Sequence, residues 1–159
     1  MDLQIQHMIK EVNRAVIQFR GIYSAWSKNH NISYNEMLVL YTIRDEGFCT
    51  QKQICDSYLL PRQTMNHVFL KMRNEGIIEI DSTRSSGKEK AFVLTDKGKI
   101  YSAPFLNSMN RVESHAADIM GEEKIKQMTA LVKEFDRALQ TALTEDTEGE
   151  QNEEQPFRK

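Results

Sequence analysis

Four polar side chains that can hydrogen-bond to DNA bases lie close together in the stretch "YLLPRQTMNHVFLKMRNEGII", residues 58–78. They are Arg62, Gln63, Asn66 and His67. Positions one, four and five residues after Arg62 fall on one face of the first two turns of a helix. Arginine can make a bidentate contact to guanine, and asparagine or glutamine can do so to adenine. We therefore predict that these four side chains contact base edges in the major groove.

Further polar and basic side chains around this stretch are candidates for contacts with the phosphate backbone. Hydroxyl, amide and cationic groups near helix starts and in basic loops are common phosphate ligands in protein–DNA complexes. The expected backbone contacts, including those of a basic hairpin tip, are Thr50, Gln51, Thr64, Lys71, Arg84, Lys88 and Lys90.

Helix signals surround the candidate base contacts. "SYNE", residues 33–36, and "TQKQ", residues 50–53, are capping-box patterns, in which the first side chain and the fourth each satisfy a backbone N–H at a helix start. Pro61 suits a first helical position, and Gly76 suits the left-handed residue that ends a helix. Two helices joined by a short turn are therefore expected, which is a helix-turn-helix.

A β-hairpin is expected directly after this helix-turn-helix. "IIEID", residues 77–81, and "KAFVLT", residues 90–95, are rich in β-branched and aromatic residues, and "STRSSGKE", residues 82–89, has the composition of an exposed hairpin tip. A hairpin in this position is the wing of a winged helix.

Long amphipathic helices are expected at both ends of the chain. Apolar residues recur every three or four positions from 5 to 26, which predicts one helix from about 3 to 29. Two more helices are expected after the wing, the last over about 122–143. These helices have little to pack against except one another and a second copy of the chain, so we expect a homodimer.

The expected fold is mainly α with a small β-wing, that is, a winged helix-turn-helix domain flanked by long N- and C-terminal dimerisation helices. The expected parts are an N-terminal dimerisation helix (1–30), a winged helix-turn-helix DNA-binding region (31–96, with the helix-turn-helix about 50–75 and the wing about 77–94), C-terminal dimerisation helices (97–143) and an acidic, disordered tail (144–159).

Charge is unevenly distributed along the 159 residues. The net charge of the chain is −2, but residues 144–159 hold six acids against two bases, so residues 1–143 carry +2. Residues 50–101 contain nine Lys or Arg against six Asp or Glu. A basic middle followed by an acidic end favours a nucleic-acid partner for the middle.

Three of the stretches already described, together with the long flanking helices, carry a family resemblance. "SYNEMLVLYTI", "TQKQICDSYLLPRQTMNHVFLKMRNEGIIEI" and "VLTDKGKIY" resemble the MarR family of bacterial winged-helix transcription regulators, over most of residues 30–101. The chain departs from the family at the wing tip, where many members carry an acidic-arginine pair and this sequence has "SSGK". The resemblance implies a homodimeric repressor that binds a pseudo-palindromic operator in double-stranded DNA and releases it when a small anionic or aromatic ligand binds.

Other functions are less well supported by the sequence. The residues Phe19, Tyr23 and Trp26 are a candidate ligand pocket, although aromatic residues at helical spacing are more often plain core, which is the favoured interpretation. Cys49 lies beside a helix start, where the helix dipole lowers a thiol pKa, so an oxidant sensor is an alternative. The scattered histidines give no diagnostic metal spacing, and no cofactor is expected.

The sequence also argues against enzymatic activity and against a membrane location. It has no Gly-rich phosphate loop, no metal-binding histidine pair and no nucleophile motif. The first residues, "MDLQIQHMIK", lack a basic start followed by an apolar core, so we expect a cytoplasmic protein. The alternative function is a winged-helix dimer that has lost DNA binding and serves as a ligand- or protein-binding module.

Overall fold

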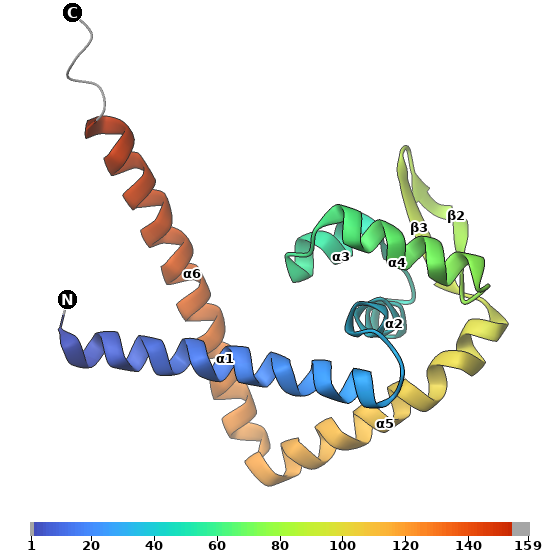
Figure 1. Ribbon diagram of the computed structural model, residues 1–159, viewed down its shortest axis with the longest axis horizontal. Coiled ribbons are helices and arrows are strands. Elements are labelled where there is room, and N and C mark those ends of the chain that lie inside the picture. Colours follow the sequence, from blue (N-terminus) through green and yellow to red (C-terminus); the bar gives the residue numbers. More distant parts are fainter. Residues whose placement is uncertain (1, 154–159) are drawn as a thin grey trace, which may run out of the picture. The chain divides into compact units, whose positions relative to one another are not determined.

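The computed structural model describes residues 2–153 of the chain (Figure 1). Its elements are α1 (Leu3–Asn29), α2 (Tyr34–Glu46), β1 (Cys49–Thr50), α3 (Gln51–Tyr58), α4 (Arg62–Asn74), β2 (Ile78–Ser86), β3 (Glu89–Leu94), α5 (Asp96–Met120) and α6 (Glu122–Glu153). The predicted first helix, helix-turn-helix and wing are present, and the expected mainly α fold with a small β-wing is confirmed.

The chain divides into two compact units, Met1–Met109 and Asn110–Lys159. The first half of α5 belongs to the first unit, where Gly98, Ser102, Leu106 and Met109 are buried. The first unit thus includes α1 and the start of α5 as well as the predicted region 31–96.

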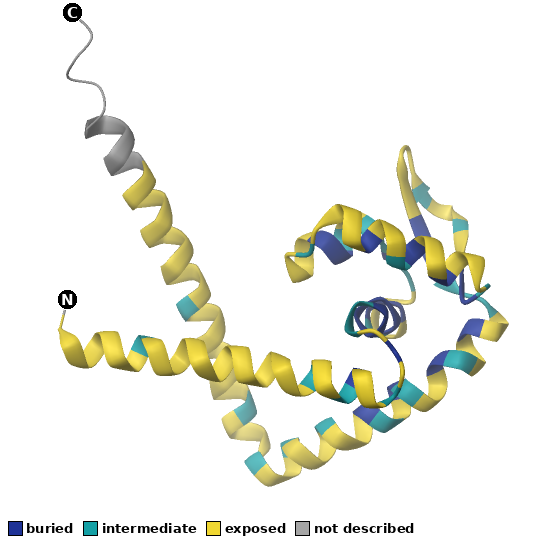
Figure 2. Ribbon diagram, in the orientation of Figure 1, coloured by how far each residue is buried: buried dark blue, intermediate teal, exposed yellow. Residues whose placement is uncertain are grey.

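Helix α2 is the centre of the first unit. Its apolar residues Met37, Leu38, Val39, Leu40 and Ile43 are all buried, on every side of the helix (Figure 2). The helix contacts α1, α3, α4, β1 and β3. A helix that is apolar all round needs neighbours all round, and these elements provide them.

Both predicted capping boxes are present. The Ser33 hydroxyl accepts from the Glu36 N–H at 3.1 Å, and the Glu36 carboxylate accepts from the Ser33 N–H at 3.0 Å. At the start of α3, the Thr50 hydroxyl accepts from the Gln53 N–H at 3.1 Å, and the Gln53 amide oxygen accepts from the Thr50 N–H at 3.2 Å. The two boxes fix where α2 and α3 begin.

The turn between α3 and α4 is tight. Leu59 ends α3 with a left-handed φ of 51°. The residue is 90% exposed. Pro61 was predicted at the first helical position, but it is the N-cap, so α4 begins one residue later, at Arg62. The Pro61 carbonyl accepts from the Met65 N–H. Gly76 follows α4 with φ 68°, which confirms the predicted left-handed glycine.

The wing belongs to a three-stranded antiparallel sheet with the order β1-β3-β2. Strand β1 was not expected, and it pairs Cys49 with Phe92 and Thr50 with Ala91. In the hairpin, Ile78 pairs with Leu94, and the register shifts between Asp81 and Ser86. The short β1 ties the start of α3 to the base of the wing.

The last helix is longer than predicted. We expected a helix to about 143 and a disordered tail over 144–159, but α6 continues to Glu153. Glutamate and glutamine are good helix formers, and no proline interrupts the helix before Glu153. The rest of the predicted tail, residues 154–159, lies outside the described residues.

Helices α1 and α6 each present an exposed apolar stripe (Figure 2). The stripe on α1 consists of Ile5, Met8, Val12, Val16 and Phe19, which are 44–57% exposed. The stripe on α6 consists of Met128, Leu131, Val132, Leu139 and Leu143, all of which are exposed. Within residues 2–153, no helix combines the length and the apolar character needed to cross a membrane.

Gly98 is required where α5 begins. A Cβ atom added there would lie 1.9 Å from the Ile77 carbonyl oxygen, and the Gly98 N–H is bound by the Thr95 hydroxyl at 2.9 Å. The Thr95 hydroxyl in turn donates to the Gly76 carbonyl. The turn after α4 and the start of α5 are thus packed backbone against backbone.

We expect Gly98→Ala to lower the free energy of unfolding by about 2 to 3 kcal/mol, because the backbone must shift to admit the methyl group. Urea unfolding at one fixed protein concentration measures the change. Gly21→Ala is the matched control: nothing lies within 4 Å of a Cβ at Gly21, and alanine there should stabilise α1 by about 0.5 to 1 kcal/mol. Equal effects at the two positions would contradict the packing described for α5.

Candidate nucleic-acid interface

Helix α4 has one face in the core and another in solvent. Met65, Phe69 and Met72 are buried, and Phe69 packs against Phe92 of β3 with ring centroids 4.8 Å apart. All four predicted base-contact residues on α4 are exposed. The apolar anchors therefore hold the helix so that its polar face is available to a ligand.

A groove of about 530 Å³ lies between α3, α4 and the wing. Its lining combines polar and charged side chains with apolar side chains of α4 and β3. It is lined by Gln51, Lys52, Cys55, Arg62, Asn66, Phe69, Leu70, Arg73, Lys88, Glu89, Lys90 and Phe92. In Figure 1 the β2–β3 hairpin stands beside α4 and projects beyond it.

The basic side chains of residues 50–101 separate into two groups. Four of the nine have partners within the protein: Lys71 with Glu36, Arg84 with Asp81, Lys99 with Asp96, and Lys97 with the Glu75 carbonyl. The other five all line the groove, and they are Lys52, Arg62, Arg73, Lys88 and Lys90. Glu89 is the single acid of the groove lining. The structure thus concentrates positive charge in one concave surface.

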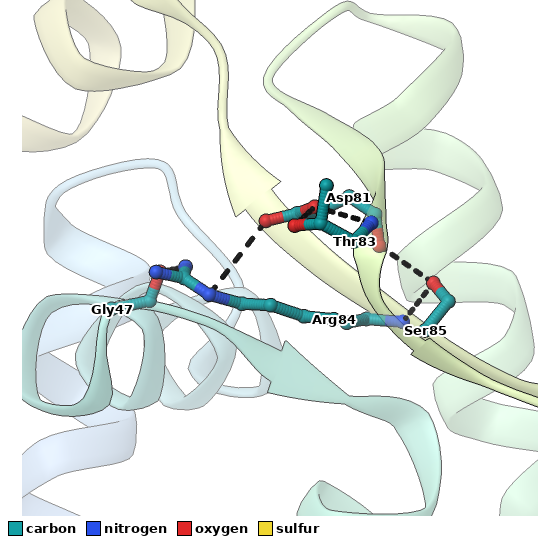
Figure 3. Close-up of polar contacts among 6 residues, drawn as sticks. Gly47, Asp81, Thr83, Arg84 and Ser85 are labelled. Atoms are coloured by element: carbon teal, nitrogen blue, oxygen red, sulfur yellow. Dashed lines mark hydrogen bonds and ion pairs between the residues drawn. The ribbon is translucent and has the colours of Figure 1, made fainter.

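Arg84 points away from the wing tip (Figure 3). Its guanidinium lies 3.7 Å from the Asp81 carboxylate, donates to the Gly47 carbonyl at 3.4 Å and stacks over the Phe48 ring at 5.5 Å. Hydrogen bonds from Thr83 hold the pKa of Asp81 below its ordinary value, and the charge of Arg84 lowers it further. The predicted backbone contact Arg84 is therefore a brace between the hairpin and the end of α2.

The irregular segment of β2 explains this direction. The Ser85 hydroxyl donates to the Asp81 carbonyl at 2.7 Å and accepts from the Ala91 N–H at 3.0 Å. These side-chain bonds replace ladder bonds where the register shifts. The remaining cations of the hairpin, Lys88 and Lys90, are the ones that reach the groove.

Lys71 is also held internally. Its ammonium lies 2.9 Å from the buried Glu36 carboxylate, and it does not line the groove. The Thr50 hydroxyl donates to the Glu89 carboxylate in addition to capping α3. Gln51 lines the groove and donates to the Arg62 carbonyl at 3.1 Å, so it joins α3 to the start of α4.

The remaining predicted contacts lie on the exposed side of α4. Thr64 is exposed. A His67 ring nitrogen bonds with the Gln63 carbonyl at 2.8 Å, so the imidazole is folded along the helix. Arg62 and Asn66 line the groove, whereas Gln63 and His67 do not. The groove thus brings together five of the predicted contact residues, which are Gln51, Arg62, Asn66, Lys88 and Lys90.

The groove lining includes residues that the sequence did not single out, among them Lys52, Leu70 and Arg73. Arg73 lies eleven residues after Arg62, which is close to three full turns, so both side chains project from the same side of α4. That spacing was available as a signal for Arg73. The positions of Lys52 and Leu70 depend on how α3 and α4 pack, which no local pattern records.

The candidate ligand pocket is only partly assembled. Tyr23 and Trp26 pack against the core of the first unit, and Trp26 stacks on His30 with centroids 3.9 Å apart. Phe19 contacts the Tyr23 ring edge-on at 5.2 Å but is 57% exposed. Among the described residues, no group of three or more His, Cys, Asp or Glu side chains has the geometry to hold a metal ion.

The fold is shared with solved structures of bacterial regulators. NMB1585, a MarR family regulator from Neisseria meningitidis, is 23% identical to this chain and superposes with a TM-score of 0.79, over 87% of this chain and 98% of its own. MepR from Staphylococcus aureus, solved as a complex with DNA, is 14% identical with a TM-score of 0.58, over 87% of this chain and 99% of its own.

A third similar structure is Staphylococcus aureus MarR in complex with salicylate and kanamycin, which is 15% identical with a TM-score of 0.62, over 88% of this chain and 95% of its own. No protein-family model and no curated protein matches the sequence. The winged-helix fold with flanking helices, which the resemblance to the MarR family predicted, is confirmed by these similarities.

The structure corrects the expectation for Cys49. A lowered thiol pKa was the basis of the oxidant-sensor alternative, but Cys49 is fully buried, and burial together with the nearby Glu46 carboxylate raises the pKa to about 12. Desolvation of the thiolate outweighs the helix dipole here.

At pH 8 we expect iodoacetamide to alkylate Cys49 at least ~100-fold more slowly in the folded protein than in urea, because few Cys49 thiols are ionised and access is blocked. Mass spectrometry of the Cys49 peptide over time gives both rates. Similar rates in the two states would show a reactive thiol and support the oxidant-sensor alternative.

Proposed function

We propose that this protein is a MarR-like, sequence-specific DNA-binding transcriptional regulator and not an enzyme. The observation that supports this most strongly is the groove, in which five cations from α3, α4 and the wing surround exposed polar side chains of α4. A helix of this kind fits the DNA major groove, and cations beside it neutralise phosphates.

The two surfaces of the interface have different roles in this proposal. Arg62, Gln63, Asn66 and His67 on the exposed face of α4 contact base edges and so provide specificity. If α4 occupies the major groove and the hairpin tip the adjacent minor groove, the phosphate strand between them passes through the groove. Its backbone ligands are then Lys52, Arg73, Lys88 and Lys90, with Gln51, Thr50 and Thr64 at the helix starts.

We further propose that the protein acts as a homodimer. The apolar stripes on α1 and α6 each cover several helical turns and are exposed in the single chain. Amphipathic helices of this kind gain most of their stability from packing of the apolar face. A second copy of the chain offers the same two stripes, so each can be covered by symmetry.

Repression relieved by a small ligand completes the proposal. It is supported by the shared fold, since one of the similar structures holds salicylate and kanamycin. Tyr23 and Trp26 are the proposed pocket residues because they lie where α1 meets the core of the first unit. Phe19, being mostly exposed, is proposed as a member of the pocket or of the dimer interface.

The test is a selection of duplexes from a random pool by the purified protein, followed by titration of the enriched duplex and a scrambled duplex across salt concentrations. Selective binding with a steep salt dependence is expected, and sedimentation should give the mass of a dimer. Equal, weak binding to both duplexes would reject DNA recognition and favour the module that has lost it.

Asn66→Ala should reduce the preference for the enriched duplex by about 1 to 3 kcal/mol, because it removes hydrogen bonds to a base edge. Asn74→Ala is the matched control: it removes the same side chain from the end of α4, outside the groove lining, and should change nothing. An unchanged preference after Asn66→Ala would show that this face of α4 does not read sequence.

Arg73→Ala should weaken binding to both duplexes alike and reduce the slope of log affinity against log salt by about one unit, as expected for one lost phosphate contact. Arg111→Ala removes the same charge from α5 outside the groove and should leave the slope unaltered. If the two variants behave in the same way, the groove does not hold the DNA backbone.

A further inference from the structure

One buried carboxylate joins the start of α2 to α4. Glu36 is 3% exposed, and its two oxygens have different partners. One accepts from the Ser33 N–H at 3.0 Å and completes the capping box, and the other accepts from the Lys71 ammonium at 2.9 Å. Burial raises the pKa of Glu36, but the hydrogen bonds from Lys71 and Ser33 lower it more, so the carboxylate stays ionised.

The capping box alone does not require a charge at this position. At the start of α3 the same motif is completed by Gln53, a neutral side chain. Glutamine at position 36 would cap α2 equally well. The negative charge of Glu36 is therefore explained by its second partner, Lys71.

Lys71 lies on the opposite side of α4 from the groove. It follows Arg62 by nine residues, and nine steps of about 100° place it roughly 180° around the helix from Arg62. Lys71 is absent from the groove lining, which is formed on α4 by Arg62, Asn66, Phe69, Leu70 and Arg73. A cation on this side of the helix cannot reach DNA that is held by the groove.

The charge of Glu36 also acts on a side chain of α5. Burial raises the pKa of Tyr101 on α5, and the negative charge of Glu36 raises it further, so the phenol lies within the field of the pair. Tyr101 in turn packs edge-on against Phe105 at 5.2 Å. Glu36 of α2 thus contacts α4 through Lys71, and its charge also influences Tyr101 of α5.

We propose that the Glu36–Lys71 ion pair is a positioning contact that fixes the rotation of α4, so that Lys71 supports sequence selectivity without touching DNA. This inference rests on the proposed DNA-binding function. The apolar anchors of α4 set its distance from the core, but packed side chains permit small rotations. A short bond between a buried carboxylate and the far side of the helix restricts those rotations.

The experiment measures binding of the enriched and scrambled duplexes across salt for the wild type, Lys71→Met, Glu36→Gln and the double variant. Lys71→Met should lower the ratio of the two affinities about tenfold and leave the salt slope unchanged. In the Glu36→Gln background, Lys71→Met should have no further effect, because the pair is already broken. Lys71→Arg should retain most of the selectivity, since it restores a cation.

Lys52→Met is the matched control, because it removes a lysine from the groove itself. It should flatten the salt slope by about one unit and weaken both duplexes alike. Circular dichroism shows which variants are folded. If Lys71→Met does not fold, Glu36→Gln replaces it in the test, because it also breaks the ion pair and keeps the cap.

Three results would overturn the positioning role. They are a flatter salt slope for Lys71→Met, an equal effect of Lys71→Met with and without Glu36, or an unchanged ratio of affinities in both single variants. If the wild type itself does not distinguish the duplexes, the proposed sequence-specific DNA binding is wrong. That conclusion does not depend on any Lys71 variant.

Discussion

The burial of the middle of α2, from Glu36 to Leu40 and at Thr42 and Ile43, is the constraint on which the first unit depends. Because apolar side chains leave this helix in all directions, α1, α3, α4, β1 and β3 must all contact it. A buried helix also needs its terminal backbone groups satisfied. The Ser33–Glu36 box does this at the start, and Gly47, with φ 80°, ends the helix and donates to the Ile43 carbonyl. The position of α4, and with it the groove, follows from packing against this central helix.

Two carboxylates of the winged helix pair with basic side chains that do not line the groove. Glu36 holds Lys71 behind α4, and Asp81 holds Arg84 at the base of the hairpin, so both charges are used within the protein. An exposed ion pair contributes little to stability, but a pair with one buried member fixes geometry at that point. The cations without such a role in residues 50–101 are the five that line the groove. The net charge of the sequence does not show that five cations gather in one groove. A count of the basic residues in 50–101 also includes four that have partners within the protein.

Local signals predicted most of the elements. Ser33, Thr50, Pro61 and Gly76 act through the backbone of their own helix, so a short sequence window contains the whole interaction. Features that depend on distant partners were not predicted. Strand β1 exists because β3 lies beside it, and Arg84 turns inward because hydrogen bonds around Asp81 shift the register of the hairpin. Lys71 is indistinguishable from a phosphate ligand in sequence, since Glu36 lies 35 residues away. The exposed polar face of α4 was predictable from helical spacing alone, whereas the groove required the packing of three elements.

The two parts of the chain differ in how far they satisfy their own apolar surface. The core around α2 is closed by side chains of the first unit, including Phe69, Phe92 and Met109. By contrast, Ser27 is the one buried residue of α1. On α6, Ile125 and Phe135 are partly buried, and the stripe residues beside them are exposed. In the proposed homodimer, the stability of these two helices depends on association more than that of the winged helix does. In the proposed homodimer, folding of the flanking helices and pairing of the two recognition helices are then one event. Helix α5 carries residues of the first core and continues into the second unit, so the two units share this one helix.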